Sequence, residues 1–172
     1  MKRNLLVATL LLLASLPCVS AQQRDDELSL QGLKGIRYAI SWGTTDPIAG
    51  DKLAGWVKML EDRADEKLKE AGIPLLKTTD QTEPAGNPML VVHVKLQRPH
   101  ASITLAEFET KFWQRVQLSR DPSKKVNAVT WETFALGGPE VTDQLLLALL
   151  NDQLERFIKA FRTANPSLAA RH

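Results

Sequence analysis

Hydrophobic and polar positions alternate along the second half of the chain. Between residues 108 and 119, one set of alternate positions contains Phe108, Phe112, Val116 and Leu118, and the other is polar or charged apart from Trp113. This period of two predicts a half-buried β-strand. Residues 126–134 are rich in Val, Thr, Trp and Phe and predict a second strand. The polar stretch 120–125 between them predicts a turn, so the two strands should pair as an antiparallel hairpin.

The register of this hairpin decides which side chains meet, because a shift of one residue moves a whole strand's side chains to the opposite face. If Leu118 lies opposite Val126, then Trp113 lies opposite Trp131 on the polar face. Such a cross-strand pair can stabilise a hairpin by up to roughly 1 kcal/mol. The same register places Glu132 beside a core phenylalanine. Registers shifted by two residues keep both indoles on the polar face but lose their direct opposition.

The remaining segments also have interpretable patterns. Apolar residues at helical spacing predict two amphipathic helices, and alternation or short apolar runs predict three more strands. We expect a glycine C-cap at Gly72, and Pro139 in the first turn of the second helix. The predicted elements are a strand over 36–42, a helix over 51–71, a short strand over 73–76, a strand over 89–97, and a helix from about 139 to about 163.

This order of elements predicts an α+β fold. We expect a two-layer sandwich with a mostly antiparallel, four- to five-stranded sheet and two amphipathic helices on one face. Residues 22–166 would form a single domain, and residues 167–172 would form a flexible tail. About 150 residues are enough for one core without covalent cross-links.

The first 21 residues resemble a targeting segment. Lys2 and Arg3 precede an apolar run from Leu5 to Leu16, and Val19-Ser20-Ala21 suits signal peptidase. The run is too short to span a bilayer with these flanks, so we expect cleavage after Ala21 and export to the periplasm or beyond as a soluble protein. Lipoprotein processing at Cys18 is the alternative, and the preceding Ser-Leu-Pro matches a lipobox poorly.

Removal of this segment changes what the composition implies. The chain has 22 basic and 20 acidic residues, and the segment removes two basic residues and no acidic one. The mature protein would be near neutral, which does not favour nucleic acid or an anionic membrane surface as a partner. Because the only cysteine is Cys18, the mature protein would contain neither a disulfide nor a thiol nucleophile.

Few residues are spaced for catalysis or metal binding. His93 and His100 lack a second histidine or cysteine at ligand spacing, and Ser102 lacks the glycines of a nucleophile elbow. Glu107 and Glu109 share a strand face with their Cα atoms roughly 7 Å apart, within the range of paired glycosidase carboxylates. Nearby basic residues favour a solvated face instead. We therefore predict no catalytic residue, metal or cofactor.

The order of elements, together with the ending Phe161-Arg162-Thr163-Ala164-Asn165-Pro166, resembles uncharacterised exported bacterial α+β proteins. The layout is also similar to the amino-terminal domain of the periplasmic protein TolB and related envelope lipoproteins. The resemblance covers most of the mature chain and rests on element order without a diagnostic motif. The resemblance implies an envelope protein, but it assigns a functional role to no residue of this chain.

The strongest candidate for function is the polar face of the hairpin. Tryptophan and arginine contribute heavily to interfaces, so a patch there would suit an envelope protein, a peptide or a saccharide. Alternatively, the indoles only lock the hairpin or are covered by the 43–50 loop. The predicted binding residues are Trp113, Trp131, Lys111 and Arg115.

The sequence therefore favours an exported envelope protein that binds or assembles rather than catalyses. A second hypothesis is a periplasmic hydrolase that combines Glu107 or Glu109 with His93 or His100. A third is a small-ligand carrier, which needs an enclosed apolar pocket between sheet and helices.

Overall fold

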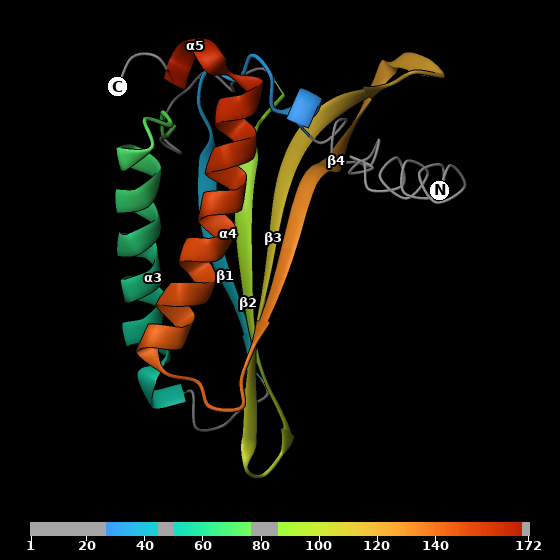
Figure 1. Ribbon diagram of the computed structural model, residues 1–172. Helices are drawn as coiled ribbons and strands as arrows, with labels where there is room; N and C mark the ends of the chain where they lie inside the picture. Colours follow the sequence, from blue (N-terminus) through green and yellow to red (C-terminus); the bar gives the residue numbers. More distant parts are fainter. Residues whose placement is uncertain (1–26, 45–49, 77–85, 170–172) are drawn as a thin grey trace, which may run out of the picture.

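A computed structural model describes residues 27–44, 50–76 and 86–169 of the protein. The predicted targeting segment, its cleavage position and Cys18 lie outside these ranges. The α+β fold is confirmed, with the long helices on one side of a single sheet (Figure 1). None of the helices in the described ranges has the length and hydrophobicity needed to cross a membrane. The elements are β1 (Arg37–Thr44), α3 (Gly50–Glu70), β2 (Met89–His100), β3 (Ile103–Leu118), β4 (Asp121–Gly137), α4 (Asp143–Ala164) and α5 (Pro166–Ala169).

The sheet has four strands in the order β1-β2-β3-β4. Strands β1 and β2 are parallel, which requires a crossover, and α3 lies in that connection. The pairs β2–β3 and β3–β4 are antiparallel. The short strand expected over 73–76 contributes only an isolated bridge between Ile36 and Leu75, so the sheet has four strands in the described part of the chain.

Helix α3 ends as the sequence predicts. Gly72 has φ +72°, a conformation that glycine adopts without steric cost. The Gly72 amide donates to the Lys69 carbonyl at 2.9 Å, and the Ile73 amide donates to the Leu68 carbonyl at 3.1 Å. These two bonds form a Schellman motif, and the buried side chains of Leu68 and Ile73 supply its usual hydrophobic contact.

Helix α4 begins later than predicted. Its N-cap is Thr142, whose Oγ1 accepts from the Leu145 amide at 3.2 Å. The prediction that Pro139 lies in the first turn is wrong, because the Pro139 carbonyl is held by the Thr104 amide of β3 at 2.9 Å. At the other end, the buried Asn165 side chain bonds the Leu30 carbonyl and the Gly32 amide. Helix α5 then occupies part of the segment that was expected to be a tail.

The core lies between the helices and one face of the sheet. Phe157 of α4 is at its centre, with ring centroids 5.4 Å from Phe112, 5.3 Å from Trp131 and 6.1 Å from Phe161. Strand β2 contributes four side chains at alternate positions, which confirms the predicted period of two. These buried side chains are Leu90, Val92, Val94 and Leu96.

The predicted hairpin register is wrong. The turn is short, at residues 119–120, and most of the stretch expected as a turn belongs to β4. Trp113 pairs with Val129, whereas Phe112 pairs with Trp131, so Thr130 is an extra residue in β4. This β-bulge moves Trp131 to the core face. Trp131 is 7% exposed and Trp113 is 37% exposed, so the two indoles lie on opposite faces.

The bulge has a clear physical reason. It brings the Trp131 ring against Phe157 in an edge-to-face contact. It also places Glu132 opposite Lys111 rather than beside a core phenylalanine. The polar atoms of Thr130 are satisfied as well, because its Oγ1 accepts from Gln114 and its carbonyl accepts from Ser29 Oγ, at 2.8 and 2.9 Å.

The two hairpin tryptophans should therefore differ sharply in their contribution to stability. We expect Trp131→Ala to lower the free energy of unfolding by about 3–5 kcal/mol, because it leaves a cavity beside Phe157. Trp113→Ala should cost less than about 1 kcal/mol. Urea unfolding of both variants tests this expectation, and equal losses would contradict the assigned faces.

Tyr38 should titrate abnormally. Its hydroxyl donates to the Glu61 carbonyl at 3.3 Å, and burial followed by the charges of Asp65, Glu61 and Asp62 raises the pKa of Tyr38 to about 12. Because the folded pKa exceeds the ordinary value of 10.0, this residue's contribution to stability is present below pH 10 and is lost as the pH rises towards about 12.

Tyr38 is the only tyrosine of the chain, so the phenolate absorbance of the intact protein reports it alone. We expect a midpoint near pH 12 in the folded protein and near 10 in urea, with no absorbance change in Tyr38→Phe. A folded midpoint near 10 would contradict the packing of β1 against α3.

Candidate functional site

One face of the sheet carries the core, and the other, which we call the open face, is not covered by a helix of the described ranges (Figure 1). The register assigns its residues, since side chains alternate between the two faces. Three of its side chains are large, apolar and exposed: Trp113 at 37%, Phe134 at 54% and Leu136 at 57%. Exposed apolar side chains on a sheet face without a covering helix make this face a candidate interaction surface.

Ion pairs cross the middle of the open face. Lys95 Nζ lies 2.9 Å from Glu107 Oε1, and Lys111 Nζ lies 2.6 Å from Glu109 Oε1. The hydrogen bond from Lys111 is the largest cause that holds the pKa of Glu109 below its ordinary value, and the charges of Lys95 and His93 act in the same direction. The lowered pKa keeps Glu109 charged beside Lys111, and Glu107 is paired with Lys95, which suits a structural role for both residues.

A hollow of about 280 Å³ lies on the open face beside Trp113. Met89 pairs with Trp113 across β2 and β3, and Asn127 pairs with Arg115 across β3 and β4. Asn87 sits just before β2 with φ +43°, and its Oδ1 accepts from Arg37 Nη1 at 2.7 Å. We call this site the Trp113 hollow, and its lining consists of Asn87, Met89, Val91, Trp113, Gln114 and Asn127.

The structure brings together three of the four predicted binding residues. Lys111, Trp113 and Arg115 occupy alternate positions of β3 and share the open face, whereas Trp131 is buried under α4. The proposed tryptophan pair is therefore wrong, and the binding role of the other three residues stays a prediction. Sequence reasoning missed Asn87, Met89 and Val91, since their nearness to Trp113 depends on the pairing of β2 with β3.

His93 is the cross-strand neighbour of Glu109, but the hydrogen bonds of His93 and His100 go to serines and not to the glutamates that a hydrolase would use. His93 Nδ1 lies 2.6 Å from Ser41 Oγ, and His100 Nδ1 lies 3.0 Å from Ser102 Oγ. Glu107 bonds Lys95 and Gln97, and Glu109 bonds Lys111. Within the described residues, no group of three acidic, histidine or cysteine side chains could hold a metal ion. The hydrolase hypothesis therefore gains no hydrogen-bonded carboxylate–histidine pair among the described residues.

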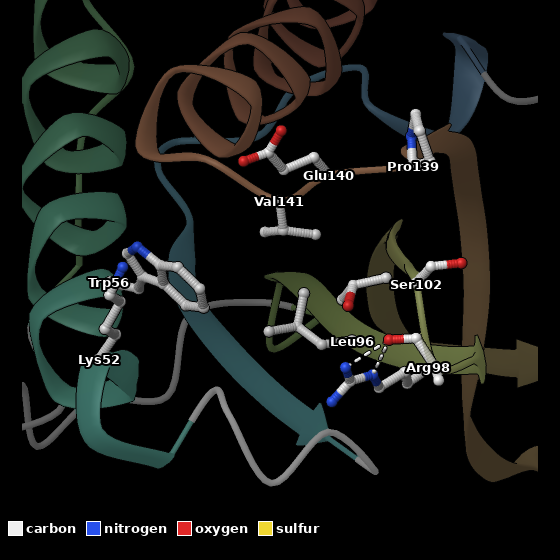
Figure 2. Close-up of a pocket in the computed structure, with 10 residues that line it drawn as sticks. Lys52, Trp56, Leu96, Arg98, Ser102, Pro139, Glu140 and Val141 are labelled. Atoms are coloured by element: carbon white, nitrogen blue, oxygen red, sulfur yellow. Dashed lines mark hydrogen bonds between the residues drawn. The ribbon is translucent and has the colours of Figure 1, made fainter.

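A larger hollow of about 490 Å³ lies at the end of the sheet, and we call it the end hollow (Figure 2). It is bounded by the start of α3, the turn between β2 and β3, and the linker before α4. Half of its lining residues are exposed, so it is open to solvent rather than the enclosed apolar pocket that the carrier hypothesis requires. Its lining residues are Lys52, Trp56, Leu96, Arg98, Ala101, Ser102, Thr104, Pro139, Glu140 and Val141.

Comparison with known proteins gives weak similarities. No protein-family model and no curated protein matches the chain. Among solved structures, the minor lipoprotein from Acinetobacter baumannii is 10% identical, covers 76% of this chain and 93% of its own, and has a TM-score of 0.34. A protein described as a putative lipoprotein from Caulobacter crescentus CB15 is 12% identical, covers 88% and 94%, and has a TM-score of 0.19.

The ion pairs of the open face can be tested by titration. Because the folded pKa of Glu109 lies below its ordinary value, the stabilisation by this carboxylate is present above the ordinary glutamate pKa and is lost as the pH falls through the folded value. We expect Lys111→Gln to raise the pKa of Glu109, measured by NMR of its carboxyl carbon. Lys95→Gln is the matched control and should raise it less, because the Lys95 hydrogen bond goes to Glu107. An equal effect of both variants would contradict the assigned pairs.

Proposed function

We propose that the protein is an exported envelope protein that binds a neutral saccharide in the Trp113 hollow and acts without catalysis. The observation that carries the proposal is the half-exposed Trp113 indole in a concave site whose lining side chains are all uncharged. The targeting pattern of residues 1–21 supports export.

The chemistry of the lining favours a saccharide over other ligands. The flat indole offers a large apolar surface at low conformational cost, which suits the apolar face of a sugar ring. The side-chain amides of Asn87 and Asn127 each contain a donor and an acceptor group, as sugar hydroxyls do. None of the lining side chains carries a charge that would pair with an ionic ligand.

The site is also held in place before any ligand binds. The Arg115 amide donates to the Gly86 carbonyl at 2.6 Å, which fixes the segment before β2 against β3. The Arg37 bond orients the Asn87 amide. Such preorganisation reduces the entropy lost on binding.

Calorimetric titration with a soluble N-acetylglucosamine oligosaccharide tests the proposal. We expect saturable binding by the wild type, and a loss of about tenfold or more in Trp113→Ala, because truncation of a central tryptophan typically has an effect of this size. Trp113→Phe should retain part of the affinity, since its ring can still stack.

Phe134→Ala is the matched control, because it removes another exposed aromatic side chain from the same face outside the hollow. It should leave the affinity unchanged. Binding that is insensitive to Trp113→Ala would overturn the proposed site. Binding of an extended peptide in place of the oligosaccharide would overturn the saccharide assignment.

A further inference from the structure

The closed end of the β3–β4 hairpin extends beyond the helices. Figure 1 shows it curving away from α4, and none of residues 114–129 is buried. We call this two-stranded segment the arm. Its base is held in place, because Gln114 Nε2 donates to the Ser29 carbonyl at 2.8 Å and Ser29 Oγ donates to the Thr130 carbonyl at 2.9 Å. The arm is therefore a supported projection whose two faces both reach solvent.

The arm is basic, unlike the rest of the described chain. It contains four basic residues and one acidic residue, which gives a net charge of +3. The remaining described residues include 13 basic and 14 acidic ones, a net charge of −1. The near-neutral balance of the whole chain therefore does not reveal this local excess. The basic residues of the arm are Arg115, Arg120, Lys124 and Lys125.

Most of this positive charge is exposed and not neutralised. Asp121 is the one acidic residue of the arm, and its Oδ2 lies 3.3 Å from Lys124 Nζ. Arg115, Arg120 and Lys125 are exposed and form no ion pair with another described residue. Exposed cations without an ion-pair partner attract an anionic surface and steer its approach.

Exposed apolar side chains accompany these cations. Val116 pairs with Val126 on the face that continues the core face of the sheet, and Val126 is 39% exposed. Arg115 and Lys125 lie on the opposite face, and Arg120 lies in the turn. An anionic membrane surface suits both kinds of side chain, because its headgroups attract cations and the boundary beneath them accepts apolar groups. A nucleic acid would use the cations alone.

We propose that the arm docks the protein on a membrane surface that contains anionic phospholipid, with its closed end towards the headgroups. Arg120, Lys124 and Lys125 contact the phosphate groups, and Val126 adds an apolar contact. The choice of a lipid partner rests on the export proposed above. None of these side chains lines the Trp113 hollow, so the docking does not depend on saccharide binding.

Co-sedimentation with lipid vesicles tests the proposal, using protein expressed from the full-length sequence and purified after export. We expect binding to vesicles of mixed phosphatidylglycerol and phosphatidylcholine that weakens with added salt, and little binding to phosphatidylcholine alone. The double variant Arg120→Gln, Lys125→Gln should lower the partition coefficient about tenfold to thirtyfold, because each basic residue near an anionic surface contributes about fivefold.

A charge-matched control separates the arm from the net charge of the protein. The double variant Lys52→Gln, Lys159→Gln removes two exposed lysines from α3 and α4 and should bind as the wild type does. Urea midpoints verify that both double variants fold, as expected for exposed positions. Equal losses in the two variants, or wild-type binding by the arm variant, would overturn the inference. Tighter binding of duplex DNA than of the anionic vesicles would overturn the lipid assignment.

Discussion

The bulge at Thr130 is the constraint on which the two faces of the sheet depend. A strand with a strict period of two would place Trp131 on the same face as Trp113, and would send Glu132 towards the core. One extra residue reverses both assignments, so the core gains an indole against Phe157 and the open face gains a carboxylate opposite Lys111. The cost of the bulge is small, because Ser29 and Gln114 satisfy the polar groups of Thr130.

The bulge is also connected to two segments near the ends of the described chain, around Ser29 and around Asn165. Ser29 bonds the bulge, and a residue later the Leu30 carbonyl accepts from Asn165 at the end of α4. The start of the described chain therefore lies between the hairpin and the second long helix, where Leu30 is fully buried. A change in this segment would disturb the bulge and the end of α4 together, although they are far apart in sequence.

The sequence predicted most of the architecture because helix and strand periods depend on local residues. Alternation in β2 and β3 identified their core faces, and Gly72 identified the end of α3. The bulge was not predicted, since its benefit comes from Phe157, which lies 26 residues further along the chain. Glu132 beside a core phenylalanine was the available signal that the simple register was wrong. The sequence also contained a signal for the N-cap at Thr142, because a threonine followed by an acidic residue such as Asp143 is a typical helix start.

The candidate site was less predictable than the fold. Trp113 was identified from its place among polar residues, but the Trp113 hollow also needs Asn87 and Met89, whose positions depend on strand pairing. The end hollow combines three separate segments, and no pattern within any one of them indicates it. Sites of this kind follow from packing between elements, so local periodicity carries no information about them.

Strand β4 lies at the edge of the sheet, and its features favour recognition by side chains over recognition by backbone. An edge strand can pair with another chain unless charges or bulges interrupt it. Here the exposed Lys124 and Lys125 lie at one end, and the bulge interrupts the ladder near the middle. Strand addition along all of β4 is therefore disfavoured. The exposed side chains of the open face remain available to a ligand, and among its three large apolar ones Trp113 lines a hollow.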